Sequence, residues 1–118
     1  MKYIKGQFQN NPESRGWFVG DFFPSDHPAK TDKFEIGFYE RKKGYEMELH
    51  MHEQKVELII IIKGKAEYQI DGDNIELNDG DYLFMQTHAK ISAVFLEDTQ
   101  LFALHAPSIP KDKVTFEE

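Results

Sequence analysis

The chain has 118 residues, enough for one hydrophobic core but not for two, because a second core would leave each half too small to offset its chain entropy. It contains no cysteine, which excludes disulfides, thiolate metal ligands and cysteine nucleophiles. Acidic residues outnumber basic ones and give a formal net charge of −7, which disfavours nucleic acid and anionic membrane surfaces as partners.

The N-terminal residues lack the apolar core of a signal peptide, and the longest apolar run, residues 58–62, is too short to cross a bilayer. Hydrophobic residues make up 40% of the chain and include ten phenylalanines, which is enough for a packed interior. We therefore expect a globular, cytoplasmic protein that does not contact a membrane.

Residues 1–33 contain two clusters of turn-forming residues, at 10–14 and 24–28, on either side of an aromatic segment at 17–23. This pattern predicts an N-terminal arm with one or two short strands. An exposed aromatic segment is an apolar liability for a monomer, so we expect the arm to pack onto a second subunit in a homodimer.

The rest of the chain consists of short runs of β-branched and aromatic residues, broken by Gly, Asp and Asn at intervals of roughly 8 to 12 residues. This spacing predicts an antiparallel all-β sandwich or barrel. Pro107 and Pro110 lack the backbone donor that a ladder requires, so residues 107–111 are not expected to continue the sheet and belong to a C-terminal tail. The predicted strands are residues 34–41, 45–52, 56–63, 66–70, 74–77, 81–85, 91–95 and 100–105.

Two histidines lie near the end of the second predicted strand. Side chains two apart on a strand point to the same face, about 6.6 Å apart, so His50 and His52 are placed to bind one divalent ion. The alternative is a pair of solvated surface histidines. Regular alternation puts three apolar side chains on the opposite face, namely Met47, Leu49 and Met51.

The same alternation puts Glu46 and Glu48 on the face of the histidines. Their charges would raise the proton affinity of the two imidazoles and weaken metal binding near neutral pH, unless the acids lie beyond the mouth of the barrel. If the strand is regular, these two acids therefore disfavour metal binding by the histidines.

Glu57 is the one acid in the strand predicted at residues 56–63, which is otherwise almost wholly apolar on both faces, as expected of a central strand covered on both sides. A buried carboxylate must be paired, protonated or bound to a metal. With the two histidines it would form a set of two imidazoles and one carboxylate. Sets of this kind are known to hold iron(II) or a similar ion and to leave coordination positions open. The alternative is that Glu57 faces water at the rim, paired with Lys55 or Lys63.

The segment that contains these residues resembles the first sequence motif of the cupin family. The order is Gly44, five residues, His50, one residue, His52, four residues, Glu57, six residues and Gly64, which agrees with the motif at every fixed position. The resemblance implies an all-β fold, the antiparallel jelly roll or double-stranded β-helix barrel of cupins. It also implies a metal site built from the two histidines and the glutamate.

Segments at residues 16–20, 31–32 and 106–113 also resemble a group of small bacterial cupins, so that the resemblance spans most of the chain. It implies one cupin domain. The expected parts of residues 1–118 are an N-terminal arm at 1–33, a barrel at 34–106 and a C-terminal tail at 107–118.

The second cupin motif is only partly present. Gly80 and Asp81 open it, but Ile91 stands where the family has its fourth metal ligand, a histidine. His88 lies three residues before that position, at a predicted turn, and we interpret it as a turn residue. The positions of the motif's proline, glycine and asparagine are held by Gln86, His88 and Phe95.

His105 is the remaining candidate ligand. It alternates with Leu101 and Ala103 on the last predicted strand, so its imidazole would replace the missing ligand if that face looks inward. The alternative is a strand-end histidine hydrogen-bonded near the rim. His27 lies in a loop and is expected to be solvated.

Three functions fit these observations. The first is a small metal-binding cupin of unknown substrate, with iron, nickel, zinc or manganese held by His50, His52, Glu57 and His105, which would activate oxygen or act as a Lewis acid on a small-molecule ligand. The second is a metal-free enzyme resembling the sugar-nucleotide epimerase and isomerase cupins, with His50 or His52 as general base and a tyrosine as acid. The third is a non-catalytic module that binds a small ligand.

Overall fold

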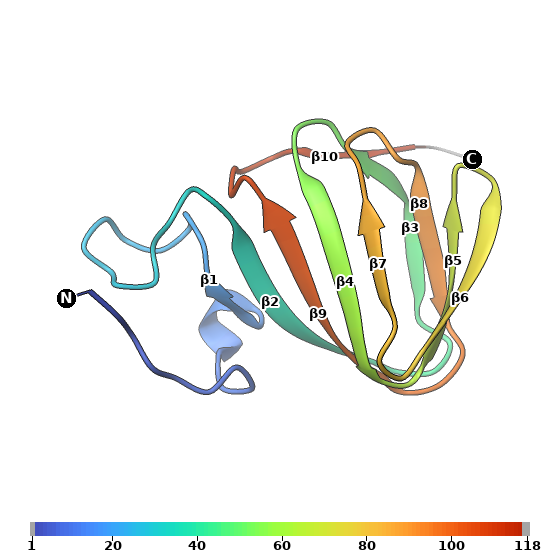
Figure 1. Cartoon of the computed structure of the whole chain (residues 1–118), viewed down its shortest axis with the longest axis horizontal. Coiled ribbons are helices and arrows are strands. Elements are labelled where there is room, and N and C mark those ends of the chain that lie inside the picture. The colour runs from blue at the N-terminus through green and yellow to red at the C-terminus, as the bar shows by residue number, and fades with distance from the viewer. Residues whose placement is uncertain (1, 117–118) are drawn as a thin grey trace.

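The computed structural model describes residues 2–116, which form two five-stranded antiparallel sheets packed face to face (Figure 1). One sheet has the order β1-β2-β9-β4-β7 and the other the order β10-β3-β8-β5-β6. The elements are η1 (Pro12–Ser14), β1 (Trp17–Val19), β2 (Glu35–Arg41), β3 (Glu46–His52), β4 (Val56–Lys63), β5 (Lys65–Ile70), β6 (Asp73–Asn78), β7 (Tyr82–Met85), β8 (Ile91–Phe95), β9 (Thr99–Ala106) and β10 (Lys113–Thr115).

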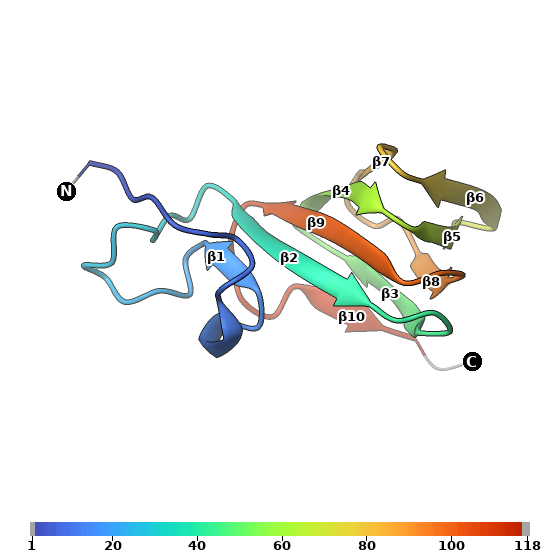
Figure 2. The ribbon, with the colours of Figure 1, turned by 90° about the horizontal axis from the view of Figure 1, so that it is seen from below.

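The core lies between the two sheets, because alternate residues of both sheets point inward. Ile61 and Ala66 are fully buried, and Tyr68 is 1% exposed. Figure 2 shows the two sheets as separate layers, with β2, β9 and β4 facing β3, β8 and β5. This arrangement confirms the predicted all-β jelly roll.

Two glycines of the first motif occupy turns that a side chain would strain. Gly64 has a φ of +128°, and a Cβ atom there would lie 2.6 Å from the Cα atom of Thr99. Gly44 has a φ of +91°, a region that favours glycine. The two glycines of the motif are therefore explained by backbone geometry, at the turn before β3 and at the turn after β4, the two strands that carry the candidate ligands.

All eight predicted strands are present, with small shifts at their ends. Residues 107–111 form no strand, as their two prolines predict, and β10 follows them and pairs with β3. One expectation is wrong: residues 2–116 do not cover the outer face of β4, since Ile60 and Ile62 are 37% and 39% exposed.

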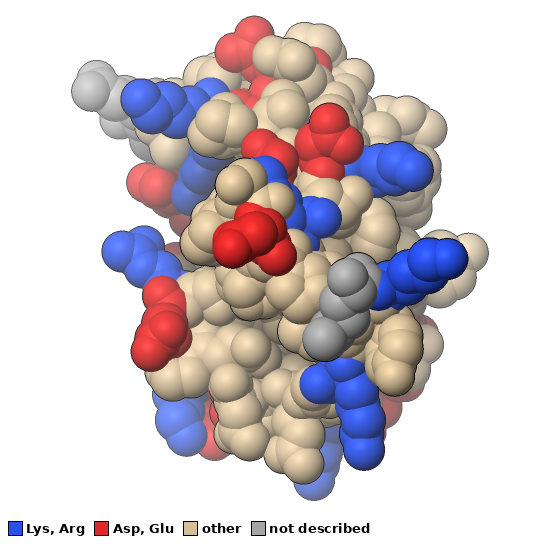
Figure 3. Space-filling model, turned by 90° about the vertical axis from the view of Figure 1, so that its left-hand side faces the viewer, with Lys and Arg blue, Asp and Glu red and all other residues tan. Residues whose placement is uncertain are grey.

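The N-terminal arm lies at one end of the molecule beside β1 and β2 (Figure 1). The ring of Phe8 packs edge-on against those of Phe38 and Phe102, each with a centroid separation of 4.9 Å. Part of the arm's aromatic surface is thus covered by its own barrel. Basic and acidic side chains are interspersed over the face seen from this end, so their charges offset one another locally (Figure 3).

Within residues 2–116, no helix has the length and apolar character needed to cross a membrane.

Candidate metal centre

Two strands and the short turn between them position the predicted ligands. His50 and His52 lie at the end of β3 and Glu57 at the start of β4, so the turn at residues 53–55 brings them together from opposite sheets. Their exposed fractions are 4%, 7% and 9%. One ligand atom from each residue lies within 4.8 Å of the other two. The sequence prediction that these three residues form one cluster agrees with this geometry.

A β-bulge turns both histidines inward. Met47 of β3 pairs with Ala93 of β8, whereas His50 pairs with Ile91, so three steps along β3 match two along β8. The extra residue reverses the alternation. Met47 consequently packs against the core on the same side as the histidines. The prediction that regular alternation puts Met47 on the opposite face is therefore wrong.

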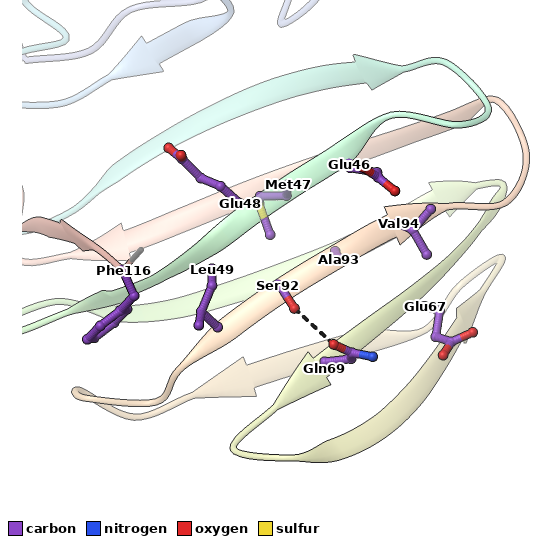
Figure 4. A pocket seen from close by; sticks show the side chains of 10 residues that line it. All are labelled: Glu46, Met47, Glu48, Leu49, Glu67, Gln69, Ser92, Ala93, Val94 and Phe116. Carbon is purple, nitrogen blue, oxygen red and sulfur yellow. Dashed lines mark hydrogen bonds between the residues drawn. The ribbon is translucent and has the colours of Figure 1, made fainter. Parts of the chain in front are cut away.

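The bulge also removes the two acids from the site. Glu46 and Glu48 are exposed and line a groove on the outer surface of β3, β8 and β5 (Figure 4). The carboxylate of Glu48 lies 3.5 Å from the Nζ atom of Lys113. The prediction that these acids share the face of the histidines and weaken metal binding is therefore wrong. The groove is lined by Glu46, Met47, Glu48, Leu49, Glu67, Gln69, Ser92, Ala93, Val94 and Phe116.

A backbone contact fixes the tautomer of His50. Its Nδ1 atom lies 2.9 Å from the carbonyl oxygen of Glu48. Because a carbonyl only accepts hydrogen bonds, Nδ1 must carry a proton in this contact, which leaves Nε2 as the ring atom that can bind a metal ion. A hydrogen bond of this kind commonly orients a metal-binding histidine.

His52 faces Glu57 across a gap. The Nε2 atom of His52 lies 3.8 Å from the Oε1 atom of Glu57, which is too long for a hydrogen bond. The Glu57 Oε1 atom is buried and has no hydrogen-bond partner among the described residues. An ion about 2.0 to 2.2 Å from each atom would bridge this gap. Burial lowers the pKa of His52 to about 4, so its ring is neutral near pH 7.

The other oxygen of Glu57 is held by His105. The His105 Nε2 atom lies 3.0 Å from Glu57 Oε2, and its Nδ1 atom lies 3.0 Å from Glu35 Oε2. Burial disfavours the charged ring, but these two hydrogen bonds outweigh it and raise the pKa of His105 to about 9. Burial likewise acts against the charged carboxylate of Glu57, yet the bond from His105 lowers its pKa.

This arrangement differs from the prediction that His105 replaces the missing fourth ligand. The ring is buried next to the cluster, as an inward-facing strand residue should be, but both of its nitrogens donate to carboxylates. No lone pair is left for a metal ion. The alternative in which Glu57 pairs with Lys55 or Lys63 in water also disagrees with the structure, because Glu57 is buried and bonded to His105.

Glu35 is the centre of a buried polar network that sequence reasoning missed. It accepts hydrogen bonds from Lys55 Nζ at 2.9 Å, Ser108 Oγ at 2.8 Å and His105 Nδ1. Burial alone would raise its pKa, but these three donors lower the pKa to about 2. The only signal in the sequence is an acid at the start of a strand whose next four residues are Ile, Gly, Phe and Tyr, and its partners are distant in the chain.

The C-terminal tail contributes Asp112. Its carboxylate accepts hydrogen bonds from the backbone N–H groups of Gln54 and Lys55, each at 2.9 Å, and so fixes the turn between β3 and β4. The Oδ2 atom also lies 3.7 Å from the Nδ1 atom of His52. The tail is thus part of the framework of the site.

The remaining predicted positions lie outside the cluster. Ile91 is 2% exposed and pairs with His50, which fills the position of the family's fourth ligand with an apolar side chain. His88 is exposed at a φ of 69°, in agreement with a turn residue. The ring of His27 stacks on Phe23 at a centroid distance of 4.3 Å.

The cluster opens into a cavity of about 170 Å³ inside the barrel. Aromatic and apolar side chains form most of its wall, and one arginine faces it. Its lining residues are Trp17, Tyr39, Arg41, Tyr45, Met47, His50, His52, Glu57, Ile59, Tyr68, Phe95, Leu101, Ala103, His105 and Lys113.

Comparison with known proteins gives one family match. The profile of the cupin domain matches residues 37–104, more than half of the chain. No curated protein matches the chain.

Solved structures with similar folds include an uncharacterized protein with a double-stranded β-helix domain from Klebsiella pneumoniae, with 22% identity over 75% of this chain and 74% of that one (TM-score 0.66). KdgF from Halomonas sp. has 23% identity over 82% and 92% (TM-score 0.65). Streptomyces Pac13, a nucleoside dehydratase, has 8% identity over 74% and 71% (TM-score 0.67). Identities this low establish a common fold and nothing finer.

Proposed function

The chain belongs to the cupin family, and on this premise we propose that it binds a divalent metal ion through His50, His52 and Glu57 and holds a small-molecule ligand beside it. The observation that carries this proposal is the set of three buried ligand atoms within 4.8 Å of one another. The unpartnered Oε1 atom of Glu57 supports it, because a buried carboxylate oxygen without a donor is costly unless something else binds it.

Each side chain has a definite part in the proposed centre. His50 offers Nε2, since its Nδ1 proton is taken by the Glu48 carbonyl. His52 offers Nε2 on the side that faces Glu57. His105 is a positioning residue, because it holds Glu57 Oε2 and leaves Oε1 free. When bound, the ion supplies Lewis-acid or redox chemistry at its open coordination positions.

The donor set restricts the choice of metal. Two imidazoles and one carboxylate, with no thiolate, suit iron(II), nickel, zinc or manganese. The same set disfavours calcium and magnesium, which take oxygen ligands. The metal is therefore a transition metal in this proposal.

The metal-free alternative has less support. A general base works best with a pKa near the operating pH. The pKa of His52, one of the two predicted bases, lies near 4, which does not match a reaction at neutral pH. The pKa of the neighbouring His105 lies near 9, so this ring does not replace it as a base. Burial also raises the pKa of Tyr68, which weakens it as an acid.

Metal analysis of protein purified without nickel resin or chelator tests the proposal. We expect close to one transition-metal ion per chain, and loss of that ion in the double variant His50→Ala with His52→Ala. The matched control is His27→Ala with His88→Asn, which removes two other histidines and should keep the metal. Protein that stays metal-free after loading with each of the four ions would refute the proposal.

The homodimer predicted from the sequence stays a prediction. The arm that motivated it packs partly on its own barrel. Large apolar side chains are exposed both in the arm, where Phe22 is 48% exposed, and on β7, where Tyr82 and Phe84 are 71% and 49% exposed. Sedimentation velocity of the wild-type protein and of Tyr82→Ser with Phe84→Ser would establish the oligomeric state and whether this face contributes.

A further inference from the structure

Arg41 places a positive charge in the same cavity as the candidate metal centre. It is the last residue of β2, is half-buried, and lines the cavity that His50, His52 and Glu57 also line. Among residues 2–116, the ion pairs do not include Arg41. A half-buried guanidinium without a carboxylate partner is available to a ligand.

Two aromatic rings hold this guanidinium in place. Its central carbon lies 4.3 Å from the ring centroid of Tyr39 and 4.8 Å from that of Tyr45. Cation–π contacts with both rings restrict the movement of the guanidinium. A restrained guanidinium loses less freedom when its N–H donors bind a planar, bidentate acceptor such as a carboxylate.

Arg41 and Glu57 lie at opposite ends of the same sheet, because Arg41 pairs with Thr99 at the start of β9 and Glu57 pairs with His105 near its end. The hydroxyl of Tyr68, which is 1% exposed, is influenced by both charges: burial and Glu57 raise its pKa, whereas Arg41 lowers it. Tyr39 is influenced by the same two charges in the same directions. The cavity thus has a cationic side at Arg41 and a metal-binding side at Glu57.

We propose that this cavity binds a small carboxylic acid whose carboxylate docks on Arg41 and whose hydroxyl or keto oxygen points toward His50, His52 and Glu57. The second half of this statement rests on the proposed metal site, whereas the first half depends on Arg41 alone. The cavity volume of about 170 Å³ matches roughly six water molecules, so the ligand has only a few carbon atoms.

A monocarboxylate fits the charges better than a phosphate does. A phosphate dianion usually takes several cationic or N–H groups. The other cation that lines the cavity, Lys113, is already paired with Glu48 at 3.5 Å. Glu57 on the far side would also repel a second negative charge. One planar guanidinium and one planar carboxylate form the matched pair.

Trp17 provides the means of measurement. It is the single tryptophan of the chain and lines the cavity, with its ring 5.3 Å from that of His105. Its fluorescence therefore reports occupancy of the cavity. The probes are lactate, its neutral isostere lactamide, and inorganic phosphate, titrated into zinc-loaded protein.

We expect lactate to bind at least tenfold more tightly than lactamide. Arg41→Gln should lose this preference, since a hydrogen-bonded charge contact of about 1.5 to 3 kcal/mol corresponds to a loss of roughly 10-fold to 100-fold in affinity. Arg41→Lys should keep part of it, and it serves as the folded variant if Arg41→Gln melts early. Arg15→Gln removes the other arginine, outside the cavity, and should change nothing.

Parallel titrations of chelator-treated protein and of His50→Ala with His52→Ala separate this proposal from the metal site. A preference for lactate that depends on Arg41 and persists in these samples supports the carboxylate subsite even if no metal binds. Equal affinity of zinc-loaded protein for lactate and lactamide, unchanged lactate binding by Arg41→Gln, or no response to lactate at all would overturn it. Phosphate binding as tight as that of lactate would overturn the assignment to carboxylates.

Discussion

The two ends of the barrel interior are both buried, but one consists of apolar side chains and the other of charged ones. At one end, Ile61 of β4 pairs with Leu101 of β9, and both are at most 3% exposed. At the other end of the same two strands, Glu57 pairs with His105, and both are 9% exposed. One pair of strands therefore carries an apolar core and a charged cluster four residues apart.

The apolar end is stabilised by burial, which is non-directional and tolerates small shifts. The charged end is stable only if every group finds a partner, because an unpaired buried charge is strongly unfavourable. Most of the polar groups at this end are hydrogen-bonded to Glu35, His105 or Asp112. Among residues 2–116, the buried side-chain atoms without a partner are Glu57 Oε1, which faces His52 Nε2, and His52 Nδ1, which lies on the side of Asp112. Both atoms therefore belong to residues of the candidate metal centre.

The largest effect is expected from breaking the charged end at its centre. Glu35→Gln leaves the charges of Lys55 and His105 without their shared carboxylate, which should lower the free energy of unfolding by about 3 to 5 kcal/mol. Metal affinity should also fall by roughly 10-fold to 100-fold, because His105 orients Glu57. Urea denaturation and metal titration measure the two effects. Glu40→Gln, exposed on the same strand, is the control, and an equal loss there would contradict this account.

A cavity at the apolar end should separate stability from metal binding. Ile61→Ala removes a fully buried side chain and should lower the free energy of unfolding by about 2 to 5 kcal/mol. Its metal affinity should stay near that of the wild-type protein under conditions where both are folded. The neighbouring Ile62→Ala, on an exposed side chain, should cost much less. Loss of metal binding in Ile61→Ala would mean that the two ends are not independent.

The pH dependence of stability sharpens the same contrast. The pKa of Glu35 is about 2 in the folded protein, below its ordinary value of 4.5. A depressed folded pKa means that the stabilisation is complete above pH 4.5 and is lost as the pH falls toward 2. The difference in unfolding free energy between the wild-type protein and Glu35→Gln should therefore shrink by on the order of 2 kcal/mol between pH 6 and pH 3. A constant difference would show that the charge of Glu35 is not responsible.

The smallest effect is expected at the tail. Asp112→Asn replaces the charged acceptor of two backbone N–H groups in the turn between the ligand strands, so metal affinity should fall by roughly tenfold with a modest loss of stability. Asp73→Asn, in an exposed hairpin, is the matched control. Equal metal affinities in the two variants would assign Asp112 to folding alone.

The parts that the sequence predicted correctly depend on local patterns. The strands follow from runs of β-branched and aromatic residues, and the trio of His50, His52 and Glu57 follows from short spacings around one turn. Each of these signals lies within a few residues of the feature it predicts. Physical reasoning from the sequence works well at this range.

The parts that it missed depend on long-range pairing. The bulge in β3 exists only in its register with β8. The Nδ1 atom of His105 donates to Glu35, 70 residues away, and Asp112 lies 58 residues from Gln54 in the turn that it fixes. The sequence of the arm does not indicate that its aromatic residues pack on their own barrel, as Phe8 does on Phe38 and Phe102. Charge and periodicity along the chain contain no record of these contacts.

The central claim is that the polar end of the barrel binds a metal ion through three side chains. The most direct test is a crystal structure of the metal-loaded protein with anomalous data collected at the absorption edge of the bound metal. The account predicts one strong peak about 2.0 to 2.2 Å from His50 Nε2, His52 Nε2 and Glu57 Oε1. A peak elsewhere, or no peak in this cluster after loading, would contradict it.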